Sequence, residues 1–438
     1  MKVHNPAVFL KNSAVRYIAA FSVTVALAVM LLAVSAFLPQ YIIQGHVADS
    51  VDFIYADYVN NSLFDRSPAS QMDVLTDTMM LRTALSTNDN YLGSILTNPV
   101  YTYEGLKEWT DVDDMLVNQA YDMPHDGVWF YSRYWMGFRA LLRMALMLFN
   151  VAQIKRYLAL VFFTLFMAVT LSVSQNTDTK TAFLFALSII LVRPHVIASS
   201  MQYNCCFLIA FLAMLLIPKI LRRPEYEGLF FMEIGMITMY FDFYTVPVIT
   251  LGFPLVYLCV LKLNAGSRLS LKELFRNIGL WCGGYGFMWV AKLVLTTVLT
   301  SENALQQGFQ SFSNRVGITK DAELEQYYSL KYALERLNET IFSDETGKVV
   351  YLTGAGIVLA VVLWKLLKGH LSGKSLRNLV PFLVLALIPL VWFAATRQPI
   401  AIHAFFQYRN IALTHWASGM FLYFLLSKEK ASLLNAKV

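Results

Sequence analysis

Charged residues are scarce in this chain. Only 15% of its 438 residues are Asp, Glu, Lys or Arg, whereas 57% are hydrophobic and the mean hydropathy is +0.51. In soluble proteins about a quarter of the residues are charged, so the composition argues against a soluble protein. We therefore expect an all-α integral membrane protein that crosses the bilayer many times.

Several common site patterns are also missing. The four cysteines (Cys205, Cys206, Cys259 and Cys282) show neither a metal-ligand spacing nor a disulfide framework. The chain has no Walker or Rossmann glycine pattern, no HExxH and no GxSxG. Gly283, Gly284 and Gly286 in "WCGGYGFMW" are better explained by close helix packing. These absences argue against nucleotide, zinc-protease and serine-hydrolase chemistry.

Apolar runs recur along the whole sequence. We predict about ten membrane spans, near residues 14–38, 157–174, 181–198, 203–217, 228–242, 244–261, 278–299, 349–364, 379–395 and 410–426. Lys and Arg collect before the first span, after the fourth, sixth and eighth spans, and after the last. Because short cytoplasmic segments hold the excess positive charge, residues 1–13 and 427–438 are predicted to be cytoplasmic tails. The net charge of +6 follows from these segments and does not indicate nucleic-acid binding.

This orientation leaves a long acidic loop outside, at residues 39–156. Between Asp49 and Arg133 it carries fourteen carboxylates against four basic residues, and its many Tyr, Trp, Leu and Met residues predict a folded unit. Spans 2–7 then occupy 157–299, a second external loop with helical spacing occupies 300–348, and spans 8–10 occupy 349–426. The stripe of Leu324, Tyr328, Tyr332 and Leu337 predicts that the second loop packs on the membrane or on the first loop.

Asp73 and Asp77 in "SQMDVLTDTMMLRTAL" are four residues apart and would share one face of a helix. Neighbouring carboxylates raise each other's pKa, which suits a general base. In the alternative, Ser70 caps the helix, Asp73 lies in its first turn and Asp77 is solvated.

A set of basic residues lies at the predicted outer span ends, where the orientation rule does not expect them. It comprises Arg193, His195, Arg397, His403 and Arg409, and Lys292 lies inside a span. Ionisable groups at that depth tend to line polar cavities, and arginine binds phosphate oxygens in pairs. The set therefore predicts a lipid-phosphate site. The alternative is that arginines snorkel at helix ends and that Lys292 pairs with a carboxylate.

Residues 129–157 combine aromatic and basic side chains. Trp129, Tyr131, Tyr134 and Trp135 resemble an aromatic belt, and Arg133, Arg139 and Arg143 follow within the same stretch. This is typical of a helix lying in the membrane interface. We expect the three arginines to join the phosphate site and Tyr134 and Trp135 to contact a sugar; the alternative is a surface anchor. Asp242, between aromatic residues, is expected to contact sugar or to pair with Lys292.

The long carboxylate-bearing first loop, the interfacial helix, the ten spans and the external basic set resemble the GT-C glycosyltransferases. Stretches such as "SQMDVLTDTMMLRTA", "YSRYWMGFRALL", "GMITMYFDFYTVPVITLGFPL", "AKLVLTTVLTSEN" and "HAFFQYR" are similar to those of a set of polytopic membrane proteins, mostly from Gram-positive bacteria. The resemblance spans nearly the whole chain. It implies a multi-pass plasma-membrane enzyme that takes sugar from a polyprenyl-phosphate donor.

The resemblance also implies a carboxylate in the first loop that acts as general base or helps to hold a metal. Asp49 and Asp52 have the position next to the first span, whereas Asp73 and Asp77 lie in the matching stretch. A tight Asp-x-Asp pair is absent, and "DVDD" with Asp111, Asp113 and Asp114 is the nearest candidate for Mg²⁺ or Mn²⁺. No cofactor is otherwise expected.

These patterns predict an inverting glycosyl transfer onto an extracytoplasmic cell-surface glycan or wall polymer, with membrane lipid as the other partner. Two alternatives stay open. A transporter or flippase for lipid-linked glycans would use the buried charges as a pathway. A non-catalytic component of a polymer-assembly complex would use the first loop for docking.

Overall fold

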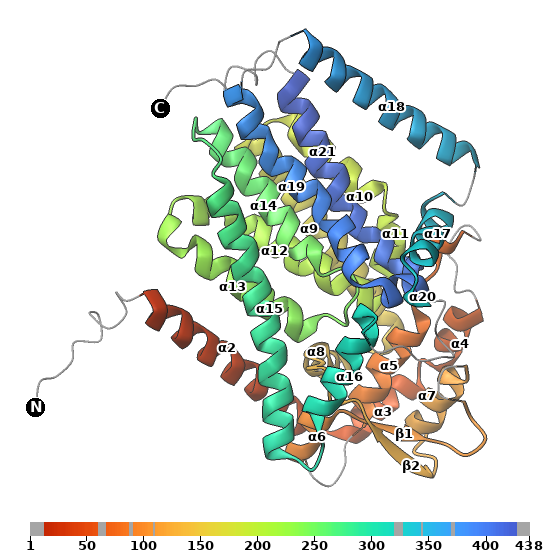
Figure 1. The fold of residues 1–438 in the computed structure, drawn as a ribbon. Helices are drawn as coiled ribbons and strands as arrows, with labels where there is room; N and C mark the ends of the chain where they lie inside the picture. Colours follow the sequence, from red (N-terminus) through yellow and green to blue (C-terminus); the bar gives the residue numbers. More distant parts are fainter. Residues whose placement is uncertain are drawn as a thin grey trace, which may run out of the picture.

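The computed structural model describes residues 13–59, 67–86, 91–107, 110–318, 327–342, 345–368 and 373–426 (Figure 1). These residues form helices and one short pair of strands, so the expected nearly all-α architecture is confirmed. Residues 1–12 and 427–438 lie outside the described part, and so do Asp65, Asp89, Glu108 and Leu324. The two predicted cytoplasmic tails therefore stay predictions.

Apolar helices coincide with all the predicted spans. In the described part of the chain they are α2 (Ser13–Ala36), α9 (Val151–Asn176), α10 (Thr179–Ile190), α12 (Met201–Leu221), α13 (Glu227–Phe241), α14 (Val248–Asn264), α15 (Leu271–Leu299), α18 (Glu345–Leu367), α19 (Gly373–Ala395) and α21 (Ile411–Leu426).

Not all of these helices are long enough to cross a membrane. Among the described residues, five segments have the required length and apolarity: Ala14–Ala36, Val151–Asn176, Met201–Leu221, Leu271–Leu299 and Arg377–Ala395. Helix α10 has 12 residues and α14 has 17, against the ~20 that a span needs. The count of ten spans therefore stays a prediction.

The span predicted at 181–198 is interrupted. Arg193 adopts a left-handed backbone with φ +61°, and Pro194 opens a separate short helix, α11 (Pro194–Ser199). A proline cannot donate the backbone hydrogen bond that a continuous helix needs at that position, and it disfavours the helical conformation of the residue before it. The span predicted there was therefore too long.

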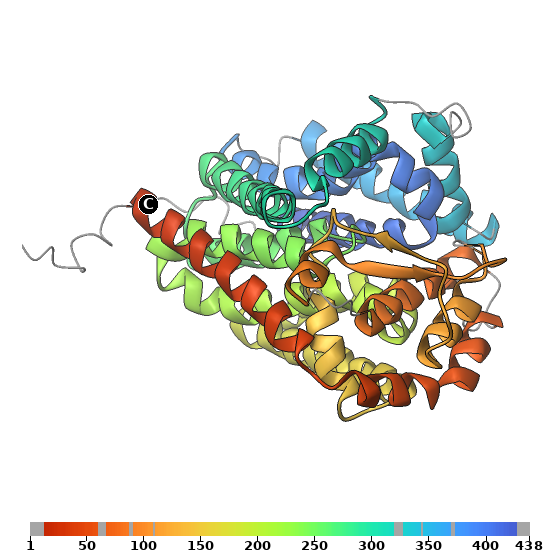
Figure 2. The same cartoon turned by 90° about the horizontal axis from the view of Figure 1, so that it is seen from below.

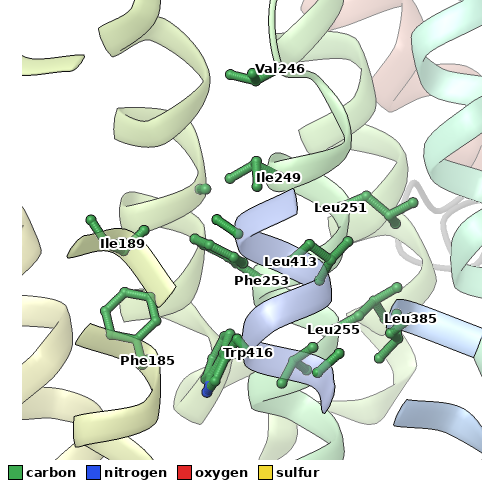
Figure 3. Packing of buried hydrophobic residues seen from close by; sticks show 14 of the residues in the cluster. Phe185, Ile189, Val246, Ile249, Leu251, Phe253, Leu255, Leu385, Leu413 and Trp416 are labelled. Atoms are coloured by element: carbon green, nitrogen blue, oxygen red, sulfur yellow. The ribbon is translucent and has the colours of Figure 1, made fainter. Parts of the chain in front are cut away.

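The core of the bundle is aromatic and aliphatic (Figure 3). Phe185 of α10 and Phe253 of α14 lie against Trp416 of α21, with ring centroids 5.0 and 5.5 Å from the Trp416 ring. Gly252 permits this approach, because a Cβ at that position would lie 2.1 Å from Leu413. The three helices are thereby packed closely.

Helices α13 and α15 pack through glycines. A Cβ on Gly284 would lie 2.1 Å from the carbonyl oxygen of Met232, whereas a Cβ on Gly286 would meet nothing within 4 Å and one on Gly283 would make only ordinary contacts. The predicted role in helix packing is thus confirmed for Gly284 and wrong for the other two.

The first long loop is folded, as expected. Its elements are α3 (Gln40–Ala48), α4 (Val51–Val59), η1 (Pro68–Ser70), α5 (Val74–Leu85), α6 (Tyr91–Thr97), β1 (Pro99–Thr102), α7 (Val112–Ala120), β2 (Gly127–Phe130) and α8 (Phe138–Leu146). Strands β1 and β2 are antiparallel, with Pro99 opposite Phe130 and Thr102 opposite Gly127. Viewed from below, α2 leads along the bundle into this loop (Figure 2).

The predicted interfacial helix is wrong in its details. Residues 129–157 form β2, a turn, α8 and the start of α9, and the arginines of α8 point into the protein. Arg139 and Arg143 are 1% and 0% exposed, whereas Leu141 on the same helix is 50% exposed. Trp135, Tyr134 and Tyr131 are also buried, so they do not form a surface belt.

The remaining described elements lie mainly on the C-terminal half. They are η2 (Pro224–Tyr226), α16 (Ala304–Val316), α17 (Leu330–Ile341), α20 (Arg397–Gln407) and η4 (Tyr408–Asn410). Helix α17 packs on α20 and on η1 of the first loop. Tyr328 and Leu337 of the predicted stripe are buried, and of the two alternatives left open, packing on the membrane or on the first loop, the contact with η1 supports the second.

Candidate functional site

A cavity of about 1070 Å³ lies where the two loops meet. Its lining comes from the start of α5, the segment from β2 to Tyr134, the turn between α13 and α14, helix α16, and helix α20. No single stretch of sequence forms this cavity. With Tyr327, which precedes α17, it is assembled from six segments that extend from Leu75 to Gln407 in the chain.

One wall of the cavity is aromatic. The rings of Tyr131, Tyr134 and Phe243 are mutually stacked, with centroids 4.8 to 5.5 Å apart, and Trp129 lies 4.8 Å from Tyr131. Asn98 fixes the turn that carries the tyrosines, because its side-chain amide donates to the carbonyls of Tyr131 (3.2 Å) and Tyr134 (2.8 Å). The Asn98 side chain therefore fixes the backbone that positions the two tyrosine rings of the wall.

Two arginines flank this wall. The Arg133 guanidinium lies 4.1 Å from the Tyr131 ring centroid, and that of Arg315 lies 4.3 Å from the Tyr244 ring. Arg315 also donates a hydrogen bond to the Tyr134 hydroxyl. Burial lowers the pKa of Arg315 to about 10, with the charge of Arg133 adding to the effect, so the Arg315 side chain still carries positive charge at neutral pH. Such a pair suits a phosphate group.

His403 also lines the cavity, from a kink in α20. Its ring stacks on Phe406 with centroids 5.0 Å apart. Burial, together with the nearby charge of Arg315, lowers the pKa of His403 to about 4. The imidazole is therefore neutral at pH 7 and acts there as a hydrogen-bonding group rather than as a cation.

Asp73 lies next to the cavity wall. It is the N-cap of α5, and its Oδ1 accepts the backbone N–H of Thr76 (3.0 Å), a residue that lines the cavity. Asp73 is 4% exposed, and its Oδ2 has no hydrogen-bond partner among the described residues. Burial raises the pKa of Asp73 to about 6, the charge of Asp77 adds to this, and the hydrogen bonds from Thr76 oppose it. The predicted cap at Ser70 is thus wrong, since Asp73 itself caps the helix.

Asp77 has a different environment. Its carboxylate accepts hydrogen bonds from the Ser200 hydroxyl (3.1 Å) and from the backbone N–H groups of Met201 (3.1 Å) and Gln202 (3.0 Å), at the start of α12. Lys155 Nζ lies 3.2 Å away. Asp77 is buried rather than solvated, and it joins α5, α9 and α12. All these contacts are structural.

Four side chains converge on the segment just before Asp73. Arg409 donates to the carbonyl of Ala69 (3.0 Å), and the Tyr408 hydroxyl donates to the same oxygen (3.3 Å). Tyr203 donates to the carbonyl of Gln71 (3.4 Å), and Arg193 donates to the Ser70 hydroxyl. Arg193 and Arg409, predicted to bind phosphate, here position η1 and hence Asp73.

Other predicted phosphate ligands bind backbone carbonyls. Arg139 donates to Ser94 (2.8 Å) and Ser86 (3.0 Å), and Arg143 donates to the carbonyls of Ser35 (2.9 Å), Leu38 (3.2 Å) and Ala84. Lys292 donates to the carbonyl of Leu96, not to a carboxylate. Trp135, predicted to contact sugar, donates to the Met288 carbonyl (2.7 Å) and does not line the cavity.

The remaining predicted residues lie away from the cavity lining. Asp49, Asp52 and Arg397 are exposed, and His195 is half-buried on α11. Asp242 lies behind the wall, where its Oδ1 accepts from the backbone N–H (3.0 Å) and hydroxyl (2.6 Å) of Thr245, a lining residue.

The acidic start of α7 forms local contacts. Asp111 accepts the backbone N–H of Lys107 (2.8 Å) and Asp114 accepts the Tyr55 hydroxyl (2.6 Å), while Asp113 is buried. The described residues contain no group of three or more His, Cys, Asp or Glu that could hold a metal ion. The dependence on Mg²⁺ or Mn²⁺ stays a prediction.

Several lining residues were missed by sequence reasoning. They are Phe243, Tyr244, Glu302, Gln307, Gln310, Asn314 and Arg315. The aromatic run "FDFY" around Asp242 and the regular polar spacing of "SENALQQGFQSFSNR" are signals that could have indicated them.

The fold and composition define a nearly all-α protein with apolar helices suited to a membrane. The chain matches no protein-family model, no curated protein and no solved structure.

Proposed function

We propose that this protein is an integral-membrane glycosyltransferase. It transfers a sugar from a polyprenyl-phosphate donor to an extracytoplasmic cell-surface glycan or wall polymer. The observation that carries the proposal is a cavity with an aromatic wall and two arginines, whose lining residue Thr76 donates its backbone N–H to the buried carboxylate of Asp73 just behind the lining. Concave sites with apolar walls and a few convergent polar groups are where small molecules usually bind.

The reaction needs few groups. The acceptor hydroxyl oxygen forms a bond to the anomeric carbon while the bond from that carbon to the phosphate oxygen breaks. The hydroxyl proton passes to Asp73, and the polyprenyl phosphate leaves with the electron pair. A single displacement of this kind inverts the configuration at the anomeric carbon. A pKa of about 6 suits the base, because Asp73 is then mostly ionised at pH 7 yet still basic enough to accept the proton.

Arg133 and Arg315 serve the leaving group. As the bond breaks, negative charge grows on the phosphate oxygens, and fixed cations in a partly buried site stabilise that charge. The stacked rings of Tyr131, Tyr134 and Phe243 form an apolar wall of the cavity against which a sugar ring can lie. The neutral His403 adds a hydrogen-bonding group.

The test is the composition of the surface glycan in a strain that lacks the protein. That strain is complemented with the wild type, with Asp73→Asn, or with Asp49→Asn as the matched control, because Asp49 is an exposed first-loop carboxylate away from the cavity lining. We expect a missing sugar substituent that the wild type and Asp49→Asn restore and that Asp73→Asn does not.

Two other outcomes would count against the proposal. Restoration by Asp73→Asn would show that Asp73 is not the base. An unchanged glycan in the deletion strain would refute glycosyl transfer and favour a transport or scaffold function.

A further inference from the structure

Helix α16 presents an uncharged polar stripe to the cavity. Gln307, Gln310, Ser311 and Asn314 all line it, and their spacing of three and four residues places them on one face of the helix. Gln310, Ser311 and Asn314 make no side-chain hydrogen bond with any residue that the structure describes. Their amide and hydroxyl groups are therefore available to a ligand.

We propose that this stripe and the aromatic wall together form the acceptor subsite, and that its ligand is a neutral saccharide chain. The inference rests on the proposed function and adds the residues that recognise the acceptor. Sugar hydroxyls both donate and accept hydrogen bonds, and Gln and Asn side chains offer one donor group and one acceptor group each. Tyr131 and Phe243 contribute apolar surface to the lining of the same cavity.

The charge pattern separates this subsite from a phosphate site. The stripe itself carries no charge, and the charged lining residues on either side of it are Glu302, just before α16, and Arg315, next to Asn314. Glu302 also lines the cavity, with its Oε2 held by the Gln307 side-chain amide at 3.0 Å, and a carboxylate there would repel an anionic headgroup. The positive charge lies with Arg133 and Arg315, which flank the aromatic wall, so the wall borders both sites and the uncharged stripe is what distinguishes the acceptor subsite.

The helix is fixed in place before any ligand binds. Asn303 caps it through the backbone N–H of Gln306 (3.0 Å), and Gly317, with φ +74°, ends it. Gly308 lets α16 lie close to α15, since a Cβ there would lie 2.6 Å from the Leu293 side chain. A rigid element loses little conformational freedom on binding, so its polar groups can discriminate between ligands.

The cavity is also large enough for more than one sugar ring. Its volume of about 1070 Å³ is slightly above the roughly 300–1,000 Å³ typical of small-molecule pockets. A chain of sugars can therefore occupy it together with the donor sugar.

The experiment compares three purified variants in detergent: Gln310→Ala/Asn314→Ala, Asn314→Asp, and Gln306→Ala. Gln306 is the matched control, because it lies on the same helix but is exposed and does not line the cavity. The probes are oligosaccharides released by partial hydrolysis of the glycan from the deletion strain, and polyprenyl phosphate. Binding of each probe is measured calorimetrically, and melting temperatures show whether each variant is folded.

We expect the double variant to bind the oligosaccharides about 10-fold more weakly, as for the loss of two hydrogen bonds, and polyprenyl phosphate as the wild type does. Gln306→Ala should match the wild type with both probes. Asn314→Asp keeps the size of the side chain and should also weaken oligosaccharide binding. This variant therefore replaces the double variant in the test if the double variant does not fold.

Unchanged oligosaccharide binding in both cavity variants, or no binding by the wild type, would overturn the inference. Equal loss of both probes in a folded variant would overturn it too, since the subsite would not then be separate from the phosphate site. Binding requires no catalysis, so a failure of the proposed transfer reaction would appear separately, in the glycan composition of the Asp73→Asn strain.

Discussion

Asparagine substitutions at Asp73 and Asp77 are expected to have opposite effects on stability, although the two residues are four apart on one helix. Asp73 has a buried carboxylate with one unpartnered oxygen, whereas Asp77 has three hydrogen bonds and an ion pair. At Asp73 the substitution removes a buried charge that destabilises the folded state. At Asp77 it removes a charge that is paired and hydrogen-bonded.

The magnitude at Asp73 follows from its pKa. Burial raises this pKa from 3.8 to about 6, so the ionised form destabilises the folded state by about 3 kcal/mol, at 1.36 kcal/mol per pKa unit. The free energy of unfolding of the wild type is therefore not reduced by Asp73 below about pH 4, and it falls by this amount as the pH rises through 6. Asparagine is an equally good N-cap, but its amide would leave a buried donor unpartnered at a cost of about 1–3 kcal/mol. At pH 8 we expect Asp73→Asn to be about 0–2 kcal/mol more stable than the wild type.

Asp77→Asn leaves the ammonium group of Lys155, which is 9% exposed, without its carboxylate. Removing one member of a buried pair costs about 3–5 kcal/mol, because the remaining charge stays uncompensated. Lys155→Met in the same background should restore part of that loss.

Thermal unfolding in detergent at pH 8 and pH 4 measures both effects. Asp73→Asn should melt at or above the wild-type temperature at pH 8 and lose that advantage at pH 4, whereas Asp77→Asn should melt well below it at pH 8. If Asp77→Asn melts like the wild type and Asp73→Asn is the unstable variant, the roles given to the two carboxylates are reversed.

Three further predictions follow from other contacts. The rate of sugar transfer should fall below about pH 6 as Asp73 becomes protonated, and His403→Gln should leave this limb of the pH–rate profile unmoved, because the pKa of His403 is about 4. Gly284→Ala should lower the melting temperature while Gly286→Ala leaves it unchanged; equal melting of the two would contradict the close packing of α13 and α15. Arg143→Met should lower the melting temperature by leaving buried carbonyls unpaired, each at a cost of about 1–3 kcal/mol, and an unaltered melting curve would show that these bonds contribute little.

The sequence located the helices well because hydropathy is a local property. Every predicted span overlaps an apolar helix, and errors arise where one residue overrides the pattern, as Pro194 does at the end of α10. Tertiary roles were harder to predict. The sequence predicts Asp77 to be either a solvated or a catalytic residue, and only its contact with the start of α12, more than 120 residues away, shows that it is buried and hydrogen-bonded.

The candidate site was predictable only in part. Asp73, Arg133, Tyr134 and His403 were named from the sequence, and the structure places them at or beside the cavity. Arg315 was not, because it lies in a segment whose amphipathic composition is typical of an exposed helix. A basic residue in a sequence gives no sign of whether it faces a ligand or a carbonyl of its own chain.

The contacts of the buried basic residues show which of them bind backbone carbonyls and which can face a ligand. Arg139, Arg143 and Lys292 donate to backbone carbonyls, many of them near helix ends and turns of the first loop, where regular secondary structure leaves acceptors unpaired. One guanidinium can satisfy several such acceptors at once, so arginine holds irregular backbone together without a large apolar core. Arg133 and Arg315 instead lie on tyrosine rings, a contact that holds the side chain while using few of its N–H donors. Arg409 also lies on tyrosine rings, but it donates to carbonyls of its own chain and does not line the cavity. Stacking together with a place in the cavity lining therefore marks Arg133 and Arg315 as the arginines that can still bind a phosphate.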